Sequence, residues 1–261
     1  MTRHRFFGML ITYRLFLNHW LRNTLPHDCA MTLNIRLLVA IAALMGLLIT
    51  ALWPQTDLWI SGLFYTQAEK FFFSQNTLSL FIHGMATTGA WIFTALCLVI
   101  MAGCFLFKKS FCFLSAKKWL LIVAAILLGP GLVANEILKD HWGRARPSQI
   151  IDFGGTKNFT PFYQPATQCH KNCSFIGGDA SFGFSLTAFA FVAAGAWRRR
   201  LWWMGLGAGA IFGINRIMMG GHFLSDTLAA ALIIIFINAA LYATLFGKDA
   251  LRKAISVSKQ P

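Results

Sequence analysis

The chain has 261 residues, of which 57% are hydrophobic and only 12% are charged, and its mean hydropathy is +0.60. A soluble domain carries about a quarter charged residues. The composition therefore excludes a disordered, collagen-like or disulfide-scaffold protein, and it argues strongly against a soluble globular one. The net charge of +14 indicates basic cytoplasmic loops of a membrane protein before it indicates a polyanionic partner, and we expect no nucleic-acid partner.

Apolar stretches of roughly the length of a membrane span recur along the whole chain. In chain order we expect six spans, at about 35–53, 78–107, 119–138, 181–197, 202–219 and 223–246. The predicted fold class is all-α, a polytopic membrane protein with a six-transmembrane-helix bundle over residues 31–250. Residues 251–261 are then a short cytoplasmic tail.

The positions of lysine and arginine predict the orientation of the bundle. Most of the 23 basic residues fall before the first span, at 108–118, at 198–200 and after residue 247. Because short cytoplasmic loops collect Lys and Arg, both termini are expected in the cytoplasm of a bacterium. The loops at 54–77, 139–180 and 220–222 then face the periplasm from a multi-pass protein of the inner membrane.

Residues 1–30 form a separate segment. Phe6, Leu10, Tyr13 and Leu17 recur at helical spacing, and polar residues such as Arg5 and Arg22 fall elsewhere, which is typical of a basic amphipathic helix lying on the inner leaflet. The alternative is that translation begins at Met31. The first apolar stretch is interpreted as an uncleaved span rather than a signal peptide.

Two of the six cysteines, Cys169 and Cys173, lie close together in the large outer loop. Adjacent thiols in an oxidising periplasm tend to pair, so we favour a disulfide over two free thiols. A metal site would need more soft ligands at suitable spacing, and we expect neither a metal ion nor another cofactor.

A basic cluster opens this outer loop, where Lys139 is followed seven residues later by Arg146 and then by Pro147. Gly143 and Pro147 predict that the preceding helix ends here. One interpretation is a cluster that touches lipid headgroups, and for Arg144, which lies between Lys139 and Arg146, we expect a contact with headgroups or solvent. However, positive charge is disfavoured on the outer side, so an anionic ligand is the better explanation.

Paired glycines precede the fourth span, with Gly177 and Gly178 followed by Asp179. Such a turn exposes backbone N–H groups to an oxyanion at the helix N-terminus. The alternative is ordinary helix capping, with Asp179 as the N-cap residue.

The third feature is Arg216 near the end of the fifth span and His222 before the sixth, with Asp226 four residues later. A helix would place His222 and Asp226 on one face. A carboxylate beside an imidazole fixes its tautomer and stabilises its cation. A purely structural pair is the alternative, but ionisable groups at membrane depth indicate function because their burial is costly.

Together these segments resemble the type 2 phosphatidic acid phosphatase family, the lipid phosphate phosphatases related to vanadium haloperoxidases. The family's first motif, a lysine followed after six residues by Arg-Pro, matches fully, and its third motif matches at Arg216, His222 and Asp226 with Asn215 in place of serine. Its second motif, Pro-Ser-Gly-His, departs: residues 176–179 are Ile-Gly-Gly-Asp, so the phosphate-site serine and the general-acid histidine are missing.

The resemblance implies a role for each matching residue. Lys139, Arg146 and Arg216 would bind the phosphoryl oxygens, and Gly178 would add a backbone N–H. His222 would attack phosphorus to form a phosphohistidine that water then hydrolyses, and Asp226 would orient it. Three cations can neutralise the equatorial charge of phosphoryl transfer without a metal.

The implied activity is dephosphorylation of a membrane lipid phosphate or pyrophosphate, with lipid A, undecaprenyl pyrophosphate or phosphatidylglycerol phosphate as candidates. Two alternatives stay open. One is phosphate transfer between lipids at the same site, and the other is a degenerate protein that binds or transports anionic lipid. Residues 119–246 carry the resemblance.

Asp179 has two possible roles in such a site. A carboxyl group at a helix N-terminus favours its charged form, which cannot donate a proton. Burial could keep it protonated, so that it replaces the histidine as general acid. Otherwise the substrate needs a leaving group that departs easily, as in a lipid pyrophosphate or a glycosyl phosphate, and the sequence favours this second reading. His141 and His170 are further candidates for a substitute proton donor.

Overall fold

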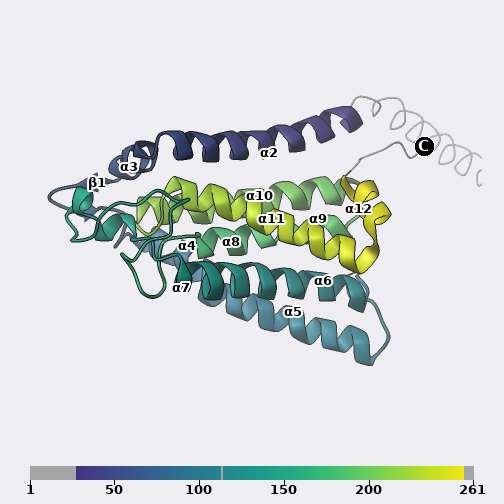
Figure 1. Cartoon of the computed structure of the whole chain (residues 1–261). Helices are drawn as coiled ribbons and strands as arrows, with labels where there is room; N and C mark the ends of the chain where they lie inside the picture. The colour runs from purple at the N-terminus through teal and green to yellow at the C-terminus, as the bar shows by residue number, and fades with distance from the viewer. Residues whose placement is uncertain (1–27, 113, 256–261) are drawn as a thin grey trace, which may run out of the picture.

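The computed structural model describes residues 28–112 and 114–255, and these are mostly helical (Figure 1). Two short antiparallel strands, β1 (Tyr65–Thr66) and β2 (Lys70–Phe71), form a hairpin. The helices are α2 (Asp28–Leu52), α3 (Gln55–Gly62), α4 (Thr77–Ala86), α5 (Thr88–Leu106), α6 (Ala116–Ile126), η1 (Leu127–Leu138), α7 (Lys139–His141), η2 (Pro147–Gln149), η3 (Ile151–Phe153), α8 (Gly178–Ser185), α9 (Ala188–Val192), α10 (Gly195–Met218), α11 (Leu224–Phe246) and α12 (Lys248–Ile255).

Three helices of the described part are long and apolar enough to cross a membrane: Thr77–Leu106, Ala116–His141 and Leu224–Phe246. A bent pair, Leu38–Leu52 with Gln55–Gly62 at 105°, would add a fourth. The two remaining expected spans do not qualify, because Gly178–Val192 is short and α10 carries four arginines. The all-α class is confirmed, whereas the count of six spans stays a prediction.

Several expected boundaries were wrong. The arginines at 198–200 belong to the first two turns of α10, because the chain breaks earlier, at Ala193 and Ala194, and arginine is a good helix former. The outer loop is shorter than 139–180 at both ends, since helices continue to His141 and restart at Gly178. The first five residues of the predicted tail, 251–255, belong to the helix α12, and the other six lie outside the described residues. The predicted amphipathic segment lies outside the described residues, except for its last three positions.

A π-helix forms the second half of the Ala116–His141 helix. Its twelve residues, Leu127–Leu138, include Pro130, which has no N–H and would clash with the carbonyl four residues earlier in an α-helix. Wider π turns remove that clash, and π segments occur frequently at functional sites. This segment leads directly into Lys139.

Close helix packing holds the centre of the bundle together. A Cβ atom placed on Gly183 of α8 would lie 2.4 Å from the backbone nitrogen of Gly209 of α10, so only glycine permits this approach. Small residues are typical of helix contacts in membranes. The outer faces instead expose large apolar side chains, among them Trp91 at 73% and Phe105 at 76%, as expected for surfaces that face lipid.

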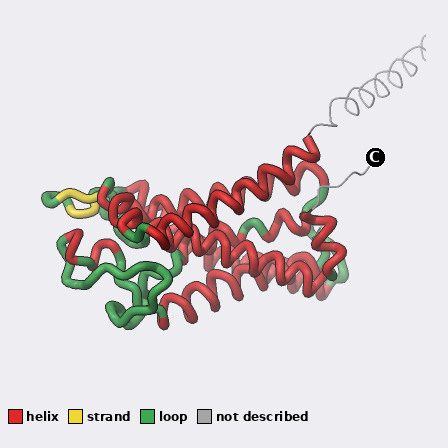
Figure 2. The backbone as a smooth tube through the Cα atoms, turned by 45° about the horizontal axis from the view of Figure 1, so that its top comes forward, coloured by secondary structure: helices red, strands yellow, loops and turns green. Residues whose placement is uncertain are grey.

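The connections gather at the two ends of the bundle (Figures 1 and 2). The long connection after α7 and the β1–β2 hairpin lie at one end, whereas α12 and the α5–α6 connection lie at the other. Under the long connection lies a small core of buried side chains: Phe71, Ala145, Ile150, Phe153 and Phe223. This core fixes the loops that border the candidate site.

Candidate active site

His222 lies at the loop-rich end of the bundle and is 1% exposed. Its Nδ1 is 2.7 Å from the carbonyl oxygen of Ser174. Because a carbonyl only accepts hydrogen bonds, Nδ1 carries the proton and Nε2 keeps a free lone pair. Burial lowers the pKa of His222 to about 4, and the positive charges of Lys139 and Arg216 add to this effect while Asp226 opposes it. At neutral pH the ring is therefore uncharged.

Asp226 supports His222 through Ser174 rather than by a direct hydrogen bond. Its Oδ2 is 3.7 Å from Nδ1 of His222, too far for such a bond. The same oxygen accepts hydrogen bonds from the Ser174 hydroxyl at 2.5 Å and from the Phe223 N–H at 2.9 Å. Asp226 thus fixes the residue whose carbonyl holds the imidazole.

Arg144 is completely buried between two aspartates. Its guanidinium donates to Asp57 at 2.8 Å and to Asp226 at 2.5 Å, and its charged carbon lies 4.3 Å from the centre of the Phe223 ring. It also donates to Ser225 at 2.8 Å. We expected Arg144, which lies outside the phosphatase motif, to face solvent or lipid headgroups. That expectation is wrong, because Asp57 of α3 supplies a buried partner from a distant part of the chain.

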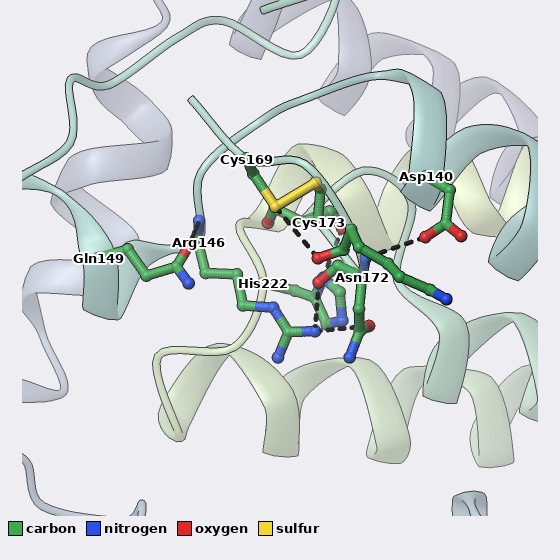
Figure 3. Close-up of a disulfide and its surroundings, with 9 residues drawn as sticks. Asp140, Arg146, Gln149, Cys169, Asn172, Cys173 and His222 are labelled. Atoms are coloured by element: carbon green, nitrogen blue, oxygen red, sulfur yellow. Dashed lines mark hydrogen bonds between the residues drawn. A yellow bond between two sulfur atoms is a disulfide. The ribbon is translucent and has the colours of Figure 1, made fainter. Parts of the chain in front are cut away.

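The predicted phosphate ligand Arg146 is held by the long loop. Its guanidinium donates two hydrogen bonds of 2.8 Å to Asn172, one to the backbone carbonyl and one to the side-chain oxygen (Figure 3). Asn172 in turn donates its N–H to Asp140 at 2.9 Å. Burial and the nearby charge of Arg216 lower the pKa of Arg146. The two arginines therefore share one electrostatic environment.

Cys169 and Cys173 form a disulfide on either side of Asn172 (Figure 3). The N–H of Cys173 donates to the carbonyl of Lys139 at 3.0 Å. The disulfide loop therefore contacts two predicted phosphate ligands. It carries Asn172, the partner of the Arg146 side chain, and it bonds to the backbone of Lys139.

Removal of the disulfide is expected to weaken phosphate binding. In a variant with Cys169→Ser and Cys173→Ser, Asn172 is less constrained, and KM for the phosphorylated substrate should rise roughly tenfold because Arg146 loses its fixed position. Steady-state kinetics of the purified protein measures this. Cys112→Ser is the matched control, because Cys112 is an exposed free cysteine elsewhere. An unchanged KM in the double variant would contradict this role of the loop.

Asp179 is not the N-cap of α8. That position belongs to Gly177, and Asp179 lies in the first turn with its side chain buried. Its Oδ2 is 2.5 Å from Nδ1 of His83 and 3.8 Å from Nε of Arg216. The capping interpretation was therefore wrong. The structure brings Asp179 together with Arg216 and with a histidine that the sequence did not indicate.

Gly178 provides the surface against which Lys139 lies. A Cβ atom at this position would come within 2.6 Å of the Lys139 Nζ and 2.8 Å of the Asn135 Oδ1. A larger residue at this position would make the Lys139 ammonium move away from the start of α8. The first N–H groups of any helix lack intrahelical partners. Because Lys139 lies against the first residue of α8, its ammonium is close to these N–H groups, and both can bind an anion.

Sequence reasoning missed His83, Asp57 and the role of Arg144. Each is an ionisable group in or beside an apolar stretch of a chain with only nine acidic residues, and that rarity was the available signal. The proposed donor His141 is exposed and bonds to backbone carbonyls of its own helix, and His170 is also exposed. Among residues 28–112 and 114–255, no group of three His, Cys, Asp or Glu side chains is arranged to hold a metal ion.

Comparisons with known proteins agree with the geometry. The model of the PAP2 superfamily matches residues 118–249. A lipid A 4′-phosphatase of Francisella tularensis subsp. novicida is 33% identical over 199 residues, which cover 76% of this chain and 89% of that protein. Proteins of the same name from Rhizobium etli and Rhizobium leguminosarum are 34% and 36% identical, over about half of each protein. No solved structure matches.

Proposed function

Because the chain belongs to the PAP2 superfamily and is a phosphatase, we propose that it hydrolyses the 4′-phosphate of lipid A. The observation that carries this proposal is the buried, neutral His222 with its free Nε2, next to the charges of Lys139 and Arg216. The name and the 89% coverage of the Francisella relative favour lipid A over the other lipid phosphates. Apolar helices and bacterial relatives together indicate a protein of the bacterial inner membrane.

In the proposed reaction, Nε2 of His222 attacks phosphorus and a P–N bond forms as the bond to the lipid oxygen breaks. Lys139, Arg146 and Arg216 hold the phosphoryl oxygens and neutralise their charge. Asp226 and Ser174 keep the proton on Nδ1. Water then cleaves the phosphohistidine and releases inorganic phosphate. The protein groups in this scheme need no metal ion.

We place this reaction at the periplasmic face, with both termini in the cytoplasm. The support comes from the positive-inside rule: basic residues dominate the end of the bundle that carries α12 and the α5–α6 connection. The long loop and the site residues lie at the opposite end. A disulfide in this loop also fits an oxidising compartment.

Taken alone, Asp179 favoured a substrate whose leaving group departs easily. The 4′-phosphate of lipid A is not such a substrate. A pyrophosphate or an anomeric phosphate departs readily, whereas the oxygen at the 4′ position of a sugar leaves as an ordinary alkoxide. An alkoxide needs a proton from the enzyme, and general acid catalysis of this kind is worth about 10²- to 10⁴-fold. A 4′-phosphatase therefore requires a proton donor. A charged Asp179 carboxylate cannot serve as that donor.

The direct test is phosphate release by the purified protein in detergent. Lipid A, undecaprenyl pyrophosphate, phosphatidylglycerol phosphate and phosphatidate are compared, and mass-spectrometric fragmentation locates the phosphate lost from lipid A. We expect free phosphate, mainly from the 4′ position. Phosphate appearing on an acceptor lipid instead would establish a phosphotransferase. Binding of lipid A without any product would favour the degenerate alternative.

A further inference from the structure

A second histidine pairs with a site residue from a helix outside the matching motifs. His83 lies on α4, and its Nδ1 is 2.5 Å from Oδ2 of Asp179 on α8. The two residues are 96 positions apart in the chain. Asp179 occupies the position at which the second motif of this family has a histidine. The structure thus restores an imidazole near that place, carried by another helix.

Asp179 is engaged as a carboxylate. The oxygen that contacts His83 also lies 3.8 Å from Nε of Arg216, so two cationic or proton-donating groups face it. A carboxylate in this position accepts the Nδ1 proton of His83, which leaves Nε2 as the ring atom free to meet a substrate. A carboxylate next to imidazole also stabilises the cation that the ring forms after it takes up a proton.

Accessibility separates the two histidines of the site. The His83 side chain is 33% exposed, whereas His222 is 1% exposed. The His83 ring is therefore the more accessible of the two to a bound lipid. A hydrogen bond of 3.0 Å from Asn215 to the carbonyl of Ser79 ties α4 to α10 beside Arg216. The asparagine that departs from the third motif therefore helps to place His83.

We propose that His83 is the general acid that protonates the leaving oxygen, and that Asp179 is its positioning residue. This assignment rests on the proposed function. The His83 ring enters this step protonated on both nitrogens. As the bond from phosphorus to the lipid oxygen breaks, its electron pair goes to that oxygen, which takes the Nε2 proton and leaves the ring neutral. The neutral ring then accepts a proton from the water that attacks phosphohistidine. One turnover thus converts lipid phosphate and water into lipid alcohol and phosphate, with both histidines restored.

The experiment compares two leaving groups in a single turnover. Wild type and His83→Asn are mixed with lipid A, whose alkoxide needs protonation, and with an acyl-chain-bearing nitrophenyl phosphate, whose nitrophenolate leaves without a proton. The first release from lipid A should slow by about 10²-fold or more in the variant. Release of nitrophenolate should stay within about threefold. Met85→Leu, at an exposed position of the same helix α4, is the matched control and should leave both rates unchanged.

Further variants separate a chemical role from a structural one. Asp179→Asn should show the same selectivity for the poor leaving group, but with a smaller loss, because it disturbs only the position of the ring. Added imidazole should restore part of the lipid A activity of His83→Ala. Equal slowing of both substrates by His83→Asn, or full activity on both, would overturn the assignment. A wild type that releases phosphate from neither substrate would instead overturn the proposed function.

Discussion

Replacement of His222 by alanine is expected to abolish phosphate release from every substrate, by a factor on the order of 10⁴ or more, because it removes the atom that bonds to phosphorus. The protein should still fold, since within residues 28–112 and 114–255 the ring has a single hydrogen bond, to the Ser174 carbonyl. Rapid quenching with radiolabelled substrate should trap a phosphoenzyme in wild type and none in the variant.

Asp226→Asn is the companion variant for His222→Ala. Because Asp226 acts through Ser174 and does not touch the imidazole, its loss should reduce the rate of phosphoenzyme formation without preventing it. Full activity of His222→Ala would end the phosphohistidine mechanism. An Asp226→Asn variant as inactive as His222→Ala, in a folded protein, would show that the carboxylate does more than fix Ser174.

Replacement of Arg144 by methionine should destabilise the protein severely. The change leaves the carboxylates of Asp57 and Asp226 buried without their cation, and loss of one partner of a buried ion pair costs about 3–5 kcal/mol. Thermal unfolding in detergent should therefore shift downward by many degrees, with poor yield of folded protein. Asp57→Asn in the same background should recover part of the loss, because it removes one of the stranded charges.

Arg146→Met is the matched control for Arg144→Met, two positions along the same segment. Its guanidinium contacts Asn172 and, in the part of the chain that the structure describes, no carboxylate, so unfolding should change little while KM for the phosphorylated substrate rises. The Arg144 variant would then lower stability, and the Arg146 variant would weaken substrate binding. Similar unfolding temperatures for both variants would contradict the structural role of the Asp57–Arg144–Asp226 cluster.

Local patterns predicted much of this molecule. Apolar stretches identified every long helix of the described residues, because a span-length run of apolar residues is visible in a single window of sequence. Motif spacing predicted His222, Asp226 and the basic residues as the candidate site, since these lie on short segments whose geometry depends little on the rest of the chain. The helix Ala116–His141 ends just before Gly143, as the glycine and Pro147 predicted.

Contacts between distant segments could not be predicted in this way. Arg144 meets Asp57 across 87 residues, and Asp179 meets His83 across 96. Neither pair has a spacing that a helix or a turn would bring together. Charge alone placed Arg144 at the surface, because an isolated arginine is costly to bury, and only the paired aspartates change that balance. The capping role expected for Asp179 was wrong for the same reason, because its partner His83 lies on a distant helix.

The π-helix Leu127–Leu138 gives this part of the chain an unusual tolerance of changes in length. Each π hydrogen bond spans one residue more than an α-helical bond, so a turn that loses a residue can become an α turn while the segments on either side keep their orientation. The same deletion in α6 would rotate everything after it by about 100° and turn Lys139 away from Gly178. Natural or engineered variants can therefore shorten this segment near Pro130 and still present the lysine to the phosphate site.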